Sequence, residues 1–218
     1  MKIKLRRRLT SIILALLMII SLIPSGLVMP ESKTLAADIT TQATSLTNYG
    51  LVDDIQDGTV LHCFNWKYTD IIAELPNIAA AGFTTVQTSP AQVGAGTGAW
   101  YWLYQPLGFY VGSNGIGTEA ELKTLCTEAH KYGMKVIVDV VANHLAGNHS
   151  SIQNDLKGSE YWHYYGSQID YKNRYAVVNG DIGMQDLNSE NSYVQQVVAN
   201  YIKSLKNDGV DGIRWDAA

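Results

Sequence analysis

The chain has 218 residues and a formal net charge of −4. Without residues 1–37, which read as a leader, 10 Lys and Arg remain against 19 Asp and Glu, a net charge of −9. This acidic balance argues against nucleic acid or an anionic membrane surface as partner. The two cysteines, Cys63 and Cys126, exclude a disulfide-rich scaffold. Both lie in apolar stretches, which favours two buried thiols, although a bridge between them stays open.

A basic segment and an apolar run open the sequence. Five Lys and Arg residues within residues 2–8 precede the apolar run 12–20, and Pro24 breaks the apolar character soon after that run. The run is too short to span a bilayer comfortably, which favours a cleaved signal peptide over an uncleaved membrane anchor. Small residues predict cleavage near Ala37. We therefore expect residues 1–37 to be removed and the protein to be secreted, with no membrane attachment afterwards.

Strand and helix patterns then alternate along the chain. Short apolar runs predict strands at 60–66, 83–88, 135–142 and 211–218. Periodic apolar residues predict helices at 69–81, 118–133 and 194–205. The second helix opens with a capping-box pattern, Thr118 and Glu121, and ends at Gly133. Two stretches lack a regular pattern: the glycine-rich and aromatic loop 91–117 and the polar segment 145–190.

Strands that alternate with helices predict a parallel sheet with helical crossovers. An open doubly wound sheet and a (β/α)₈ barrel both satisfy this pattern. The Gly-x-Gly-x-Gly run at 94–98 lies inside a loop and does not open a helix, so it is a weak nucleotide signal. Polar residues at alternate strand positions, such as Asp139 and Asn143, suit strand ends that face a common centre. These residues favour the barrel.

The closing strand carries charge on one face. Alternation places Gly212, Arg214 and Asp216 together, with Ile213 and Trp215 buried on the other side. One interpretation is a buried ion pair that fixes the strand register. The other is a carboxylate that the neighbouring guanidinium keeps ionised, and so available as a nucleophile.

Four stretches together resemble the α-amylase family of glycoside hydrolases: Asp139-Val-Val-Ala-Asn-His144, Met184-Gln-Asp-Leu-Asn188, Asp211-Gly-Ile-Arg-Trp-Asp-Ala-Ala218 and Trp100-Tyr-Trp-Leu-Tyr-Gln-Pro106. They occur in the family's order over about residues 59–218. The resemblance implies an α/β (β/α)₈ TIM barrel, of which about the first four βα units are present, that hydrolyses α-1,4-glucosidic bonds. The implied domains are the barrel at 38–144 and 191–218 and a small inserted domain at 145–190.

The resemblance also implies roles for the charged residues. Retaining glycosidases use one carboxylate as nucleophile and a second carboxyl group as general acid. By resemblance Asp216 is the nucleophile and Arg214 orients it and keeps it charged. Asp139 is implied to be a buried partner of Arg214 that supports the site without acting in catalysis. His144 matches a histidine that hydrogen-bonds the sugar.

The aromatic loop supplies further candidates by the same resemblance. Tyr101, Tyr104 and Gln105 are expected to contact sugar, because a rigid ring with a hydroxyl suits a pyranose that has apolar faces and polar rims. Trp100 and Trp102 are expected to pack beneath the long loop.

A Ca²⁺ site is the one cofactor that the resemblance implies. Calcium prefers hard oxygen ligands, and the motif matches supply Asn143 from the barrel and Asp186 from the inserted domain. A backbone carbonyl near Val177 or Val178 is a further candidate. The remaining histidines show no metal-ligand spacing.

The sequence departs from the family pattern at its end. No Glu within residues 1–218 matches the context of the general acid, so we assign none and expect an inactive amino-terminal part of a longer enzyme. The predicted function is a secreted, monomeric α-amylase that acts on starch and related α-glucans. A glucanotransferase of the same superfamily and a non-catalytic carbohydrate-binding protein remain as alternatives.

Overall fold

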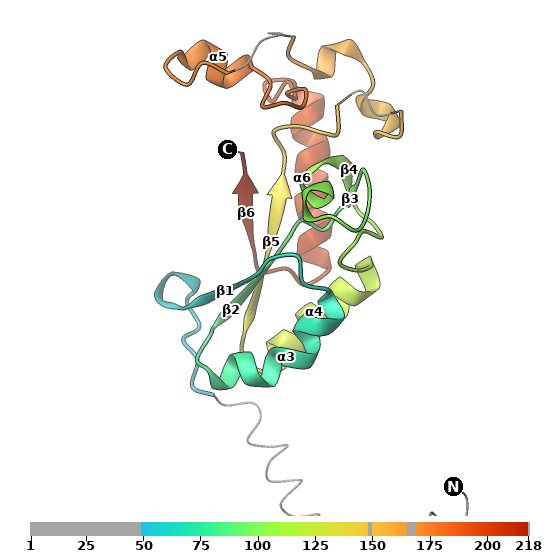
Figure 1. Ribbon diagram of the computed structural model, residues 1–218. Coiled ribbons are helices and arrows are strands. Elements are labelled where there is room, and N and C mark those ends of the chain that lie inside the picture. Colours follow the sequence, from blue (N-terminus) through green and yellow to red (C-terminus); the bar gives the residue numbers. More distant parts are fainter. Residues whose placement is uncertain (1–48, 148–149, 165–168, 218) are drawn as a thin grey trace, which may run out of the picture. The chain divides into compact units, whose positions relative to one another are not determined.

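The computed structural model describes residues 49–147, 150–164 and 169–217 (Figure 1). The expected signal peptide, 1–37, lies outside the described residues. In the part of the chain that is described, no helix has the length and apolar character needed to cross a bilayer.

Four parallel strands form the main sheet in the order β1-β2-β5-β6 (Figure 1). Their bounds are Val60–Cys63, Thr85–Thr88, Lys135–Val141 and Gly212–Asp216. The crossover helices are α3 (Tyr68–Ala80), α4 (Glu119–Lys131) and α6 (Ser192–Asn207). The predicted parallel sheet is therefore confirmed, and each strand begins or ends within three residues of its predicted position.

The strand order separates the two architectures that the sequence allowed. The four parallel strands follow one another in chain order, so every crossover steps in the same direction. Right-handed crossovers in one direction place all the helices on the same face of the sheet. A doubly wound sheet would instead reverse its order at a switch point. The observed order is that of a barrel segment.

Helix boundaries follow from local chemistry. At the start of α4 the Thr118 hydroxyl accepts a hydrogen bond from the Glu121 amide (3.3 Å), and the Glu121 carboxylate accepts one from the Thr118 amide (2.8 Å). The predicted capping box is thus present. Gly133 follows the helix with φ = +74°, a left-handed conformation that favours glycine.

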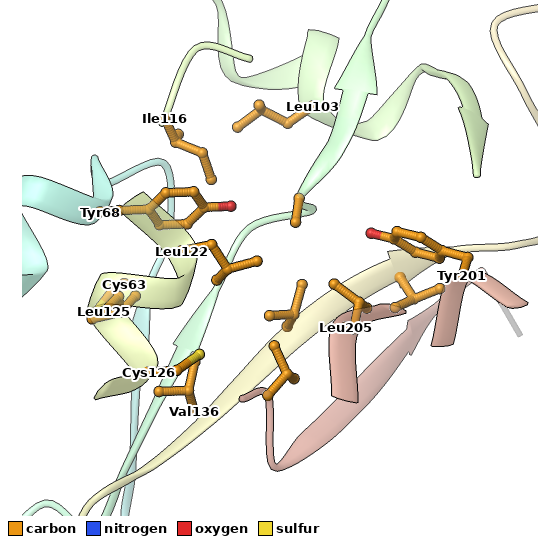
Figure 2. Close-up of a cluster of buried hydrophobic side chains, with 14 of the residues drawn as sticks. Cys63, Tyr68, Leu103, Ile116, Leu122, Leu125, Cys126, Val136, Tyr201 and Leu205 are labelled. Atoms are coloured by element: carbon orange, nitrogen blue, oxygen red, sulfur yellow. The ribbon is translucent and has the colours of Figure 1, made fainter. Parts of the chain in front are cut away.

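The core lies between the helices and the sheet. α4 buries four residues that recur at helical spacing, Leu122, Leu125, Cys126 and Ala129. Figure 2 shows Tyr68 of α3 and Tyr201 of α6 directing their rings into this core from opposite sides. Cys63 and Cys126 are buried and unbridged, which confirms two thiols. Burial raises the pKa of Cys63 to about 11 and that of Cys126 to about 12.

Two segments between the strands contain more structure than the sequence predicted. The loop 91–117 holds an antiparallel hairpin of β3 (Gln92–Gly94) and β4 (Pro106–Val111) around the 3₁₀ helix η2 (Trp100–Tyr104). Segment 145–190 contains the short elements η3 (Asn154–Leu156), η4 (Ser159–Tyr161) and α5 (Arg174–Asn179). A 3₁₀ turn, η1 (Ile55–Asp57), precedes β1.

The packing expected for the last strand was wrong. Trp215 was predicted to be buried, but 45% of it is exposed. It lines an apolar groove of about 530 Å³ with Val198 and Ile202 of α6. β6 is an edge strand of the described sheet: β5 is its neighbour on one side, and no described strand pairs with its other side. An edge strand leaves its side chains less covered than a central strand does.

The side chain of Gln92 extends the main sheet. β2 stops pairing with β5 at Thr88 and Val138, and beyond that point the Gln92 amide binds Val141. Its Oε1 accepts from the Val141 amide (2.9 Å) and its Nε2 donates to the Val141 carbonyl (2.9 Å). Gln92 is fully buried, so this side chain satisfies backbone groups that water cannot reach.

Replacing Gln92 by Met keeps most of the volume but leaves the Val141 amide and carbonyl without partners. We expect Gln92→Met to lower the free energy of unfolding by about 2–5 kcal/mol, because each buried unsatisfied group costs about 1–3 kcal/mol. Chemical denaturation would measure the loss. The exposed Gln196→Met is the control and should stay within about 0.5 kcal/mol of wild type. Equal effects of the two substitutions would contradict this role for Gln92.

Candidate active site

Polar side chains collect on the sheet face opposite the helices. The strands are parallel, so their carboxyl ends lie at one edge, and the register pairs Asp139 with Arg214 and Val141 with Asp216. Apolar residues of the alternate positions, such as Val138 and Val140, enter the core instead. The sheet therefore separates a dry helical side from a charged side.

The predicted charged group is assembled on that side. Arg214 Nη1 lies 2.7 Å from Asp216 Oδ1 and 3.4 Å from Asp139 Oδ2. The hydrogen bond to Asp216, opposed by burial, raises the pKa of Arg214. Asp139 is fully buried, whereas 21% of the Asp216 side chain is exposed. The exposed carboxylate can therefore meet a ligand, and the buried one cannot.

Two partners of Asp139 were not found by sequence reasoning. Gln87 Nε2 donates to Asp139 Oδ1 over 2.8 Å, and the Tyr104 hydroxyl donates to Oδ2 over 2.8 Å. Burial, followed by the hydrogen bond to Asp139, raises the pKa of Tyr104 well above its usual range. The sequence signal for Gln87 is a lone amide between the apolar Val86 and the strand end.

A cavity of about 480 Å³ opens above this group. Its walls are His62, Phe64, Gln87, Trp100, Tyr104, His144, Ile182, Met184, Arg214 and Asp216. Aromatic rings form one side of it, with the Tyr104 ring stacked on Phe64 at a centroid distance of 6.2 Å. Ile182 and Met184 come from segment 145–190, the predicted insertion. The cavity thus combines a carboxylate, flat apolar rings and polar hydrogen-bonding groups, a combination that suits a sugar.

The aromatic residues differ from the expectation in part. Trp100 is 52% exposed and lines the cavity, so its predicted packing beneath the loop was wrong. The loop folds into η2, and this turn directs the indole outward. Trp102 does pack, because a Cβ added at Gly96 would meet its ring at 2.9 Å.

Tyr101 and Gln105 are not in the same cavity as Tyr104. Tyr101 is exposed and its ring lies 4.9 Å from that of Trp102, between centroids. Gln105 lines an adjoining cavity of about 670 Å³, which shares Met184 with the first.

His144 is buried at the edge of the cavity. Its Nε2 lies 3.0 Å from the Tyr104 carbonyl oxygen. A carbonyl only accepts, so Nε2 carries the proton and Nδ1 is left as an acceptor. Among the described residues Nδ1 has no hydrogen-bond partner. Burial lowers the pKa of His144, so the ring is neutral near pH 7.

The two predicted calcium ligands are neighbours. The Asn143 carbonyl accepts from the Leu187 amide (2.8 Å), and the Asn143 side chain lowers the pKa of Asp186 against the larger effect of burial. Burial raises the pKa of Asp186, whose Oδ2 lies 2.6 Å from Nδ1 of His163. Side-chain oxygens of the kind that Ca²⁺ prefers therefore meet here. In residues 49–147, 150–164 and 169–217, no three His, Cys, Asp or Glu side chains form a metal-binding group.

The described residues therefore bring together two candidate calcium ligands, the Asn143 amide and the Asp186 carboxylate. Val177 and Val178, whose carbonyls were further candidates, lie in α5 with exposed side chains.

Comparisons with known proteins agree with the fold and the site. Residues 68–218 match the family model "Alpha amylase, catalytic domain". The α-amylase of Clostridium acetobutylicum is 37% identical over 184 residues, which cover 80% of this chain and 24% of that protein. The α-amylase of Aeromonas hydrophila is 35% identical over 176 residues, covering 74% of this chain and 40% of that protein. The chain thus spans well under half the length of these relatives.

Solved structures give the same result. The crystal structure of α-amylase I from Eisenia fetida superposes with a TM-score of 0.68 at 27% identity, covering 73% of this chain and 37% of that one. The α-amylase of Geobacillus thermoleovorans superposes with a TM-score of 0.67 at 27% identity, covering 75% of this chain and 40% of that one. These neighbours are TIM-barrel enzymes, which confirms the predicted (β/α)₈ class. The chain belongs to the α-amylase family, and residues 68–218 are part of the family's catalytic domain.

Proposed function

We propose that the full-length protein is a secreted, monomeric α-amylase that hydrolyses α-1,4-glucosidic bonds of starch and related glucans with retention of configuration. The observation that carries this proposal is the Arg214–Asp216 contact of 2.7 Å at the base of an aromatic cavity. The related enzymes support an α-glucan substrate: the Geobacillus structure is complexed with acarbose, and a mutant of the Eisenia enzyme is complexed with maltohexaose.

In the proposed reaction Asp216 attacks the anomeric carbon and forms a covalent glycosyl intermediate, which water then hydrolyses. Arg214 holds the attacking carboxylate in one orientation through their contact of 2.7 Å. We propose that the neutral His144 hydrogen-bonds a sugar hydroxyl. This requires the ring to exchange the Tyr104 carbonyl for the sugar or to turn, because Nε2 contacts that carbonyl and Nδ1 is buried. Trp100 and Tyr104 supply flat surfaces for the sugar ring.

The leaving group needs an acid that the described residues do not provide. None of the Glu side chains in the described ranges lines the cavity around Asp216. We therefore place the general acid outside these residues and expect the 218 residues alone to lack hydrolytic activity. Every test of activity accordingly uses the full-length enzyme.

Calcium, when bound, would add a structural cross-link. Asn143 lies just past the end of β5 and Asp186 lies in the inserted segment, so an ion held by both would join the two. Residues 1–37 would be removed during export, which brings the mature enzyme and its acidic surface to the extracellular substrate.

Asp216→Asn tests the catalytic role. The substitution keeps shape and volume and removes the negative charge, so maltoheptaose should still bind while kcat falls by about 10⁴-fold or more, as the loss of a nucleophile requires. Steady-state kinetics and calorimetric binding would measure both quantities. Asp57→Asn, at an exposed position in η1, is the matched control and should leave kcat unchanged. Near-normal turnover by Asp216→Asn would exclude Asp216 as nucleophile.

Calcium binding is tested by thermal unfolding. Saturating Ca²⁺ at 100 times its Kd should stabilise the folded protein by about 2.7 kcal/mol relative to a chelator. Asp186→Ala should lose this difference, whereas Asp170→Ala, on the exposed surface, should keep it. Equal unfolding midpoints of the wild-type protein in calcium and in chelator would remove Asn143 and Asp186 from a metal site.

A further inference from the structure

The cavity contains a side chain to which the proposed reaction gives no role. Gln87 is the one residue of β2 that is not fully buried, and it faces the cavity. In the sheet register it lies beside His62 of β1 and Ile137 of β5. Its amide reaches diagonally to the next inward residue of β5, Asp139, where Nε2 is 2.8 Å from Oδ1.

Asp139 depends on this contact because it is fully buried. Its Oδ2 is shared by the Tyr104 hydroxyl at 2.8 Å and by Arg214 Nη1 at 3.4 Å. In the part of the chain that the structure describes, the hydrogen bond to Oδ1 comes from Gln87. A buried carboxylate with an unpaired oxygen is costly and responds by taking up a proton or by turning.

The protonation and the orientation of Asp139 in turn fix the positions of two groups at the reaction centre, the Tyr104 ring and the Arg214 guanidinium. Oδ2 can accept the hydrogen bond of the Tyr104 hydroxyl and attract Arg214 at the same time only while it carries no proton. If Asp139 turned or took up a proton, the Tyr104 ring would lose its anchor and Arg214 would be held by Asp216 alone. A neutral amide is suited to the task, because it supports the charge of Asp139 without adding charge beside Asp216.

We propose that Gln87 is a positioning residue of the reaction, which fixes the Asp139 carboxylate and through it the Tyr104 ring and the Arg214–Asp216 pair. This inference rests on the proposed function. Gln87 acts through Asp139 and takes no part in bond making or breaking.

Two substitutions separate positioning from simple structural support. Gln87→Met keeps the length of the side chain and removes its hydrogen bonds. We expect kcat on maltoheptaose to fall by about 10- to 100-fold at every pH, as for a displacement of about 1 Å at a reaction centre, with a smaller change in KM. Gln56→Met, at an exposed position, is the matched control and should leave both constants unchanged.

Gln87→Glu makes the effect depend on pH. Its carboxyl would lie beside Asp139, and two such neighbours retain one shared proton. While that proton is present the Glu can donate to Asp139 as Gln does, and once it is lost the two carboxylates repel. The ratio of kcat/KM to the wild-type value should therefore be near one at acidic pH and fall as the pH rises and the shared proton is lost.

Taking the ratio to wild type cancels the titration of the groups that both proteins share. The charged or titratable groups facing position 87 are His62, Tyr104, Asp139, His144, Arg214 and Asp216. A purely structural role for Gln87 would lower the amount of folded enzyme and leave the pH profile unchanged. A wild-type kcat for Gln87→Met, or a wild-type pH profile for Gln87→Glu, would overturn the inference.

A crystal structure of Gln87→Met tests the inference independently of activity. We expect the Tyr104 hydroxyl and Arg214 Nη1 to move from Asp139 Oδ2 by about 1 Å, the displacement that carries the expected kinetic loss. Unchanged positions would overturn the positioning role even if the enzyme hydrolyses glucans as proposed. Moved positions in a protein without glucan hydrolysis would instead reject the proposed function and retain the role of Gln87 in the geometry.

Discussion

The buried carboxylate of Asp139 is the constraint on which the site depends. A charge that is cut off from water must have its oxygens satisfied, and three donors from three different elements do so here. Gln87 comes from β2, Tyr104 from η2 and Arg214 from β6. These contacts fix how the three elements lie relative to β5, and they hold the Arg214 guanidinium, which binds Asp216 of the same strand.

The residues that follow β5 connect segment 145–190 to the sheet. His144, which follows β5, forms an isolated bridge with Asp186, and the Leu187 amide donates to the Asn143 carbonyl. Met184, two residues before Asp186, then lines the cavity beside the charged pair. A metal ion held by Asn143 and Asp186 would therefore act on the segment that shapes the substrate cavity.

Features encoded locally could be predicted from the sequence. The Arg214–Asp216 pair follows from strand alternation, and the start of α4 follows from the three-residue spacing of Thr118 and Glu121. The contacts of Asp139 with Tyr104 and Gln87 span 35 and 52 residues, and no periodic pattern reports such pairs. Trp100 was misassigned for a related reason, because turns in a glycine-rich loop decide which way its ring points.

The central claim is that Asp216, held by Arg214, attacks the sugar directly. It is tested most directly by the anomeric configuration of the first product when the full-length enzyme cleaves maltoheptaose, followed by proton NMR before mutarotation. Attack by Asp216 followed by attack of water gives two inversions, and the proposed mechanism predicts a first product of α-configuration. A first product of β-configuration would mean that water attacks the anomeric carbon directly, and it would contradict the nucleophilic role of Asp216.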